Sequence, residues 1–353
     1  FDLGKKIKTT QVNIFVSLPI YLKAISRIKE ARIIDSLDAF LLEVPTGFAI
    51  YLSSILNKDR TFLIFVGDML ACLQTTKFDW RRIANEIYFR FERMALFFLY
   101  RNAHVVNGAL NILDKKSLRY SVPLRLRRSS PEVHFSTFNR NELFLGTQKS
   151  YNGHVIKITT CRHYRPETNL EFIVEVASEL KKKNFKFIWN VIGLGEEGIE
   201  KLSNLAIMDN VKEEIKFYKF LDKGDIIKKL RGSNLYLDPC RVATGLGRGI
   251  FEAFSQSVPV LMFPRTMENI VDPEAHFITM PKAVPTDVAN QIITVSSDKE
   301  YLEDLRKNAY RLAKGATVEN EMAFLSDYIK RVIVPKDSMK RYKDSARSYS
   351  SLG

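Results

Sequence analysis

The 353-residue sequence is poor in cysteine and has no long hydrophobic run. Its three cysteines are Cys72, Cys161 and Cys240, and no two of them form a Cys-x-x-Cys pair. This spacing excludes a thiolate zinc site and is typical of proteins in a reducing cytoplasm. The longest apolar run, 94–100, is far shorter than the ~20 residues of a membrane-spanning helix, so we expect no transmembrane segment. No signal-peptide pattern is visible, and Phe1 in place of Met is consistent with a trimmed start.

Several motifs of common enzyme classes are also missing. The five histidines are scattered without the spacing of metal ligands, so we expect no metal. The sequence has no Gly-x-x-x-x-Gly-Lys-Ser/Thr loop, which argues against a P-loop ATPase. A Gly-x-Ser-x-Gly elbow is absent as well, which argues against an esterase of the α/β-hydrolase type.

The composition is that of an ordinary globular protein with a strong positive charge. Hydrophobic residues make up 46% and charged residues 27%, and a chain of this length suits two domains of roughly 150 residues each. The formal net charge of +14 indicates anionic partners, such as phosphates, nucleic acid or an acidic membrane surface. The basic residues are dispersed and lack the aromatic stacking pairs of known nucleic-acid modules, so a nucleic-acid partner is disfavoured.

Short apolar or β-branched runs alternate with helical periodicity in both halves of the chain. This alternation predicts parallel sheets covered by helices, and therefore an α/β fold. The expected strands are 12–17, 39–44, 61–66, 104–107, 154–160, 185–192, 215–220, 235–237, 258–263 and 276–280. The expected helices include 47–56, 80–100, 110–118, 170–182 and 226–230. From about residue 285 the pattern is wholly helical and ends in the expected helix 319–332. The Arg-, Ser- and Asn-rich stretch 125–152 predicts a boundary, giving domains 1–150 and 151–334 and a basic tail 335–353.

A glycine-containing loop between a strand and a helix is the most specific local pattern. The strand ends at Asp238, Gly245 and Gly247 follow in the loop, and a helix begins near Arg248. Glycines allow close approach of a ligand, and a helix N-terminus attracts anions. Glu252 lies one turn into the helix, where its carboxylate can accept hydrogen bonds from hydroxyl groups. The alternative is a loop that serves only as a tight turn.

Two arginines follow the first predicted strand of the second half. Arg162 and Arg165 lie between that strand and a helix that begins near Thr168. Two guanidinium groups at the carboxyl end of a strand can bind a diphosphate through bidentate hydrogen bonds. The alternative is a solvated turn in which the arginines only add solubility.

These segments resemble the nucleotide-binding half of the family 4 glycosyltransferases, which are retaining enzymes with two facing Rossmann-like domains (the GT-B architecture). The resemblance runs from His154 to Ile333. The similar segments are 158–179, 191–195, 217–239 and 244–260. In the family the first reads strand, Gly-Arg, Pro-Glu-Lys-Gly, helix, the second is a Gly-x-Gly turn and the third is strand, short helix, strand, Pro. The fourth reads Glu-Gly-Phe-Gly, four residues, Glu-Ala and then Gly-x-Pro-Val, where this chain has Thr-Gly-Leu-Gly, Glu-Ala and Ser-Val-Pro-Val.

The resemblance implies a retaining glycosyltransferase of the hexosyltransferase type, which transfers sugar from a nucleotide-diphosphate sugar to a glycan, lipid-linked or protein acceptor. The implied donor-binding residues are Thr244, Gly245, Leu246, Gly247, Arg248, Glu252 and Gly193, and the implied catalytic residues are Asp68, Arg162 and Arg165. Arg162, Arg165 and the amides at 245–247 would offset the charge of the departing diphosphate without a metal. Glu252 would hold the ribose hydroxyls.

The sequence departs from the family's pattern at two positions. Thr244 replaces the family's first glutamate, and Thr168 replaces its phosphate-binding lysine, for which Arg165 would substitute. These departures keep open an alternative function, a catalytically weak partner subunit that binds sugar nucleotide or glycan. The first half resembles the acceptor domain faintly. Asp68, at a predicted strand end, would position an acceptor hydroxyl or the donor sugar, or it would serve only as a helix cap or turn residue.

The predicted helix 80–100 has two interpretations. Its apolar side chains recur at helical spacing: Trp80, Ile87, Tyr88, Phe91, Met94, Ala95 and Phe98. With the arginines around them, they would form an amphipathic helix on an anionic membrane that presents a lipid-linked acceptor. Alternatively, the helix is buried against the first sheet. We therefore expect a cytoplasmic protein, with peripheral membrane attachment left open.

Overall fold

The computed structural model describes residues 40–44, 52, 56, 60–65, 80–99, 104–107, 137–146, 155–165, 168–240, 247–263, 276–280 and 283–333. Of the expected elements, the strand 12–17 and the helix 110–118 lie outside these ranges, and of the helix 47–56 only residues 52 and 56 are described.

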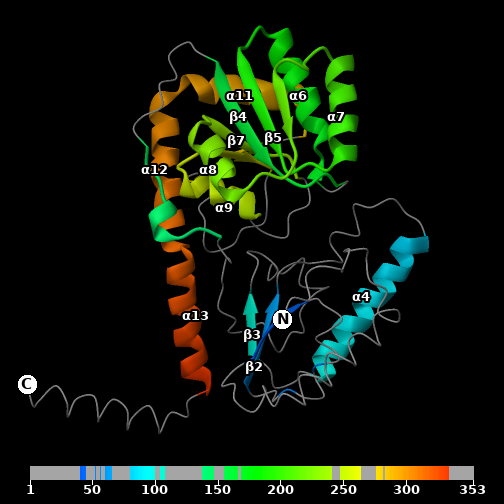
Figure 1. Ribbon diagram of the computed structural model, residues 1–353, viewed down its shortest axis with the longest axis vertical. Coiled ribbons are helices and arrows are strands. Elements are labelled where there is room, and N and C mark those ends of the chain that lie inside the picture. The colour runs from blue at the N-terminus through cyan, green and yellow to red at the C-terminus, as the bar shows by residue number, and fades with distance from the viewer. Residues whose placement is uncertain are drawn as a thin grey trace, which may run out of the picture.

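The larger sheet is parallel and six-stranded (Figure 1), as the alternating pattern predicts. Its strands are β4 (Ile156–Cys161), β5 (Phe187–Ile192), β6 (Ile215–Tyr218), β7 (Leu235–Asp238), β8 (Val260–Met262) and β9 (Phe277–Thr279). Their order is β6-β5-β4-β7-β8-β9. The chain builds outward from β4 on one side and from β7 on the other, so the strand order reverses between these two neighbours. Ligands of doubly wound sheets bind at such a switch point, outside the carboxyl ends of the strands.

Helices cover this sheet on both faces and continue to the end of the described chain. They are α6 (Glu171–Lys182), α7 (Glu196–Met208), α8 (Lys223–Arg231), α9 (Arg248–Ser255), α11 (Pro285–Ser297), α12 (Lys299–Gly315) and α13 (Val318–Ile333). Expected strands and helices in this half agree with the structure to within a few residues at their ends. The α/β class is therefore confirmed.

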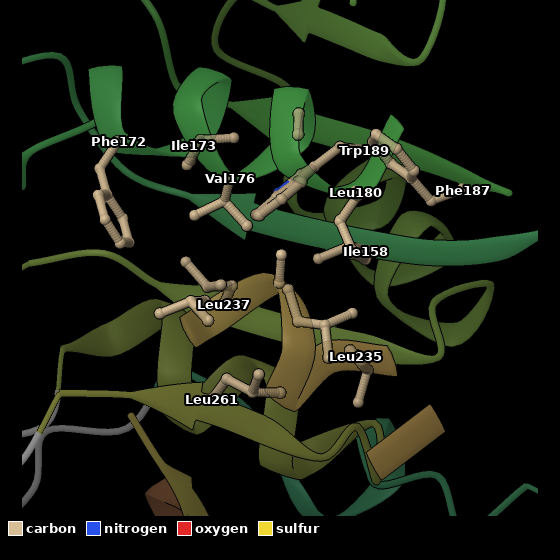
Figure 2. Close-up of a cluster of buried hydrophobic side chains, with 14 of the residues drawn as sticks. Ile158, Phe172, Ile173, Val176, Leu180, Phe187, Trp189, Leu235, Leu237 and Leu261 are labelled. Atoms are coloured by element: carbon tan, nitrogen blue, oxygen red, sulfur yellow. The ribbon is translucent and has the colours of Figure 1, made fainter. Parts of the chain in front are cut away.

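Two hydrophobic cores lie on opposite faces of the sheet, because successive side chains of a strand point to opposite faces. Leu235 and Leu237 belong to one core, and Tyr236 between them belongs to the other. In the first core, Phe172, Ile173, Val176 and Leu180 of α6 pack toward Ile158 and Trp189 (Figure 2). The i, i+4, i+8 spacing predicted this buried face of α6.

The smaller sheet is also parallel. It consists of β1 (Phe40–Val44), β2 (Thr61–Phe65) and β3 (His104–Asn107) in the order β1-β2-β3, and α4 (Trp80–Leu99) lies between β2 and β3 in the chain. Helix α13 extends beside this sheet (Figure 1), where the rings of Phe62 and Tyr328 meet edge to face at 5.9 Å. Within the described residues, no helix combines the length and hydropathy needed to span a bilayer.

One face of α4 is exposed along its whole length. The exposed large apolar residues are Trp80, Ile83, Ile87, Phe91, Met94 and Phe98, while Tyr88 and Ala95 are half-buried. Of the seven side chains in the predicted stripe, five are therefore exposed, and the interpretation in which the stripe is buried against the first sheet is wrong for these five.

The segment 137–146 is attached to helices of the second half. Phe138 is buried in the core that contains Tyr236. The side chain of Ser257 donates to the carbonyl oxygen of Phe144 at 2.6 Å. Arg306, whose side chain is 1% exposed, donates to the carbonyl oxygens of Gly146 (2.6 Å) and Ser257 (3.3 Å) and to Glu303 (2.8 Å). The predicted boundary at 150/151 falls outside the described residues and stays a prediction.

We expect Arg306→Met to lower the free energy of unfolding by about 2–4 kcal/mol, because its removal leaves two carbonyl groups and a carboxylate without their donor. Arg311→Met is the control, since Arg311 is exposed on the same helix and bonds only to Asn308 in the contacts described. The control is expected to change the same quantity by less than about 0.5 kcal/mol. Urea denaturation followed by circular dichroism measures both, and equal losses would contradict the prediction.

Candidate functional site

The loop that follows β4 begins at Arg162 and lies against the turn that follows β5. The amide of Arg162 donates to the carbonyl oxygen of Ile192 at 2.9 Å. Gly193 has a φ of +96°, a conformation that favours glycine. A β-carbon at Gly193 would lie 3.1 Å from the carbonyl oxygen of Arg162. Gly193 is therefore next to Arg162, and its backbone allows the two turns to approach closely.

The side chain of Arg162 is held by Asp238, the last residue of β7. Its Nε donates to Oδ1 at 3.0 Å and its Nη2 donates to Oδ2, so the pair is bidentate. Asp238 is completely buried, whereas 21% of the Arg162 side chain is exposed. Burial acts to lower the pKa of Arg162, but the charge and hydrogen bonds of Asp238 outweigh it and raise that pKa. Arg162 is therefore a fixed cation at the switch point.

The guanidinium of Arg162 also lies against the N-terminus of α9. Gly247 is the N-cap of this helix, and a β-carbon there would lie 2.6 Å from both Nη1 and Nη2. A β-carbon at Gly249 would lie 2.5 Å from the hydroxyl of Tyr236, so this helix packs directly on β7. Two glycines thus bring the positive end of the helix dipole next to a guanidinium. This combination attracts anions.

Arg165 lies in the same loop as Arg162 but is exposed. His163 lies between the two arginines in the sequence. Its pKa is lowered by partial burial first and then by the positive charges of Arg165 and Arg162. The positive charges of both arginines therefore reach His163, which lies between them.

Thr168 shapes this loop. Its Oγ1 accepts the amide of Arg165 at 3.1 Å and lies 2.9 Å and 2.7 Å from the carbonyl oxygens of His163 and Arg165, one of which its hydroxyl proton can satisfy. Thr168 is buried. Where the family has a phosphate-binding lysine, this chain has a side chain that hydrogen-bonds its own backbone.

Glu252 lies on the first turns of α9 and is half-buried. Thr137 donates from its hydroxyl to Glu252 Oε1 at 3.0 Å. Burial raises the pKa of Glu252, while the hydrogen bond from Thr137 and the charges of Lys223 and Arg248 oppose this rise. Lys223 in turn donates to the carbonyl oxygen of Thr137 (2.5 Å) and to Glu142 (2.6 Å). The half-buried carboxylate is therefore held by the hydroxyl of Thr137, a donor that a ligand hydroxyl can replace.

The structure brings together six of the ten predicted site residues near the carboxyl ends of β4 and β7: Gly193, Arg162, Arg165, Gly247, Arg248 and Glu252. The other four, Asp68, Thr244, Gly245 and Leu246, lie outside the described residues. Sequence reasoning did not assign a role to Asp238, Thr137 or Lys223. An acidic residue at a strand end was a visible signal for Asp238, but its partner was not visible.

Among the described residues, no three His, Cys, Asp or Glu side chains gather in a way that would hold a metal ion. The cations at this site are side chains and a helix end. The arrangement is suited to binding a diphosphate through charge and directed hydrogen bonds.

Residues 148–312 match the model of a protein family described as glycosyl transferases group 1. A comparison with curated protein sequences gave no match. The resemblance identified in the sequence is therefore confirmed by the family model.

Solved structures share the fold over most of the chain. A glycosyltransferase from Rickettsia africae is 13% identical, with 94% of this chain and 85% of that chain covered and a TM-score of 0.64. HepE from Anabaena, in complex with UDP and glucose, is 14% identical, with 88% and 81% covered and a TM-score of 0.66. Sucrose-phosphate synthase from Thermosynechococcus elongatus is 13% identical, with 96% and 82% covered and a TM-score of 0.67. The predicted GT-B-like fold is confirmed.

We expect Gly247→Ala to weaken binding of a nucleoside diphosphate by about tenfold, since the new methyl group displaces the guanidinium of Arg162 from a charge-assisted hydrogen bond. The backbone of Gly247, with a φ of −67°, accepts alanine, so the effect acts through Arg162. Gly195→Ala is the control: Gly195 is the N-cap of α7, and a β-carbon there would meet nothing within 4 Å. Calorimetric titration measures both, and equal affinities of the two variants would refute this role of Gly247.

Proposed function

We propose that this protein, whose residues 148–312 match the family of glycosyl transferases group 1, is a retaining hexosyltransferase that uses a uridine-diphosphate sugar. The observation that carries the proposal is the position of Arg162 at the N-terminus of α9, one turn from Glu252. A fixed guanidinium, a helix end and a carboxylate match the diphosphate and ribose of such a donor in charge and in hydrogen-bonding groups.

The chemical step requires charge stabilisation on the leaving group. As the bond from the sugar to the diphosphate breaks, negative charge develops on the diphosphate oxygen. Arg162, Arg165 and the amides at the start of α9 offset that charge, and they need no reorganisation because the sheet already holds Arg162 in place. In this proposal the described residues supply the electrostatic part of the reaction.

Glu252 supplies the contact to the ribose. Its carboxylate already accepts a hydrogen bond from one hydroxyl group, that of Thr137, at 3.0 Å. A ribose hydroxyl has the same donor chemistry and would replace or join Thr137. The raised pKa of Glu252 reflects its partial burial, which strengthens a hydrogen bond to the ionised carboxylate.

The remaining assignments rest on sequence positions. We assign the donor to residues 151–334 and the acceptor to residues 1–150. Thr244, Gly245 and Leu246 would contact the donor phosphate and sugar, and Asp68 would position the acceptor hydroxyl or the sugar. Uridine is chosen as the base because HepE, which has a similar fold, was solved with UDP and glucose. The acceptor class is a glycan, a lipid-linked sugar or a protein.

The test of the function is a transfer assay with UDP-, GDP- and ADP-sugars and a panel of acceptors. We expect turnover with UDP-glucose or UDP-N-acetylglucosamine, and Arg162→Ala should lower kcat/KM by about 10²- to 10³-fold, the effect of removing a preorganised charge-stabilising donor. Arg140→Ala is the control, since the side chain of Arg140 is exposed and donates to Asn320 of α13, while only its backbone amide donates to Glu319.

Two other outcomes have distinct meanings. If the protein binds UDP but transfers sugar to no acceptor of the panel, the result would favour the partner-subunit function, which the threonine at position 244 motivates. Intact turnover by Arg162→Ala would overturn the proposed role of the site.

We further propose that α4 lies on an anionic membrane surface and brings the acceptor domain to a lipid-linked acceptor. The exposed apolar stripe runs from Trp80 to Phe98, about five turns of helix at 3.6 residues per turn. Exposed tryptophan and phenylalanine suit a bilayer interface, and the net charge of +14 favours anionic lipid.

Flotation with phosphatidylcholine vesicles, with and without about 30% phosphatidylglycerol as the anionic lipid, tests this surface. We expect binding only to the anionic vesicles and its loss in Phe91→Asp, because a charge is placed in the middle of the apolar stripe. Ile207→Asp, at an exposed apolar residue of α7, should bind as the wild type does. Self-association in solution that Phe91→Asp abolishes, without vesicle binding, would instead assign the stripe to a second copy of the chain.

A further inference from the structure

A guanidinium has two edges that can each form a pair of parallel hydrogen bonds. Asp238 occupies the edge formed by Nε and Nη2 of Arg162. Of the five N–H donors of an arginine, the two on Nη1 and the second on Nη2 are not used by Asp238. The Nη1–Nη2 edge is the part that lies against Gly247, since a β-carbon there would be 2.6 Å from both nitrogens.

Asp238 is itself held rigidly. It is completely buried at the end of β7, and its Oδ1 also accepts the amide of Cys240 at 3.3 Å. Strand β7 pairs in parallel register with β4, which carries Arg162 at its end. The carboxylate therefore has a fixed position relative to both the loop of Arg162 and the start of α9, and a bidentate contact fixes the plane of the guanidinium as well as its place.

We propose that Asp238 is a positioning residue for the transfer reaction: it orients the guanidinium of Arg162 so that the Nη1–Nη2 edge faces the diphosphate held at the N-terminus of α9. This inference rests on the proposed function. It adds a residue, an acidic one, to a site whose ligand is an anion. Asp238 does not touch the donor and acts through Arg162 alone.

Because Asp238 is negatively charged, its removal is expected to change kcat rather than the KM for the donor. Paired with Asp238, Arg162 attracts the esterified diphosphate of the intact donor weakly, because the two charges largely offset each other at a distance. A free nucleoside diphosphate already carries the charge that develops on the leaving group, so its binding does depend on the directed hydrogen bonds of Arg162. With the intact donor, these hydrogen bonds gain strength only where charge grows on the diphosphate in the transition state. Removing the carboxylate therefore leaves donor binding as strong as before or stronger, while the misaligned guanidinium stabilises the transition state less.

A residue that only stabilises the fold would behave differently. Loss of a buried ion pair weakens the protein as a whole, lowers the melting temperature and reduces the fraction of active enzyme without selecting one kinetic constant. Thr159→Val is the matched control for this effect. Thr159 is buried in β4 and its hydroxyl pairs with that of Ser233, just before β7, at 2.6 Å, so its loss removes a buried hydrogen bond beside β7 without touching Arg162.

The experiment compares wild type, Asp238→Asn, Arg162→Ala, the double variant and Thr159→Val in the transfer assay with UDP-sugar. We expect Asp238→Asn to lower kcat by about 10- to 100-fold, the scale of a misplaced catalytic contact, with the donor KM unchanged or lower. In the Arg162→Ala background, Asp238→Asn should change kcat by less than about threefold, because the residue through which it acts is gone. Thr159→Val should keep the wild-type kcat per folded molecule.

Arg162→Lys gives a reading that leaves Asp238 in place. A lysine ammonium can pair with Asp238 but has no planar second edge, so we expect its kcat to fall nearly as far as that of Arg162→Ala. Wild-type kcat in Arg162→Lys, or equal effects of Asp238→Asn with and without Arg162, would overturn the inference, and the first of these readings does not require Asp238→Asn to fold. A wild-type protein that transfers sugar while Asp238→Asn does so equally well refutes the inference alone, whereas a wild-type protein that neither binds nor transfers the donor refutes the proposed function.

Discussion

The bidentate contact between Arg162 and Asp238 is the constraint from which the rest of the site follows. It joins the ends of β4 and β7, the two strands at which the strand order reverses. A guanidinium needs a fixed partner to stay in a half-buried place, and a buried carboxylate needs a cation to stay ionised. Each group therefore stabilises the charged form of the other, and together they place a cation at the point where parallel sheets bind ligands.

The two glycines of α9 complete this arrangement by bringing the helix end to the cation. Position 247 faces the guanidinium and position 249 faces Tyr236, so both lie where a side chain would push the helix away. Tyr236 in turn donates to the carbonyl oxygen of Cys161, one residue before Arg162. Strand end, loop and helix N-terminus are thus locked to one another through short contacts, which is the preorganisation that charge stabilisation needs.

Much of the second half could be predicted from local patterns, because its signals are local. Phe172, Val176 and Leu180 recur every four residues, and all three are buried on one face of α6. Gly245 and Gly247 indicated that a loop precedes α9, and the helix begins at Arg248 as predicted. In contrast, Asp238 and Arg162 are separated by 76 residues, and their contact depends on β4 lying next to β7, an order that no single segment encodes.

Other parts of the site resisted prediction for related reasons. Thr137 and Glu252 lie 115 residues apart and meet only because 137–146 is attached to α9. From the sequence, Thr168 was interpreted only as the loss of the family's positive charge. In the structure its hydroxyl oxygen accepts the amide of Arg165 and so shapes the loop. For α4, periodicity predicted the helix but not where its stripe faces, because an apolar face identifies no partner.

The glycines of α9 also limit how the protein could be redesigned. Because side chains at positions 247 and 249 would collide with Arg162 and Tyr236, the first turn of this helix offers Arg248, which is exposed, as the place where a side chain can be changed without moving the backbone. Libraries aimed at a different sugar nucleotide would therefore gain most by varying position 248, and randomising the whole turn would displace Arg162 or Tyr236 in most of their members.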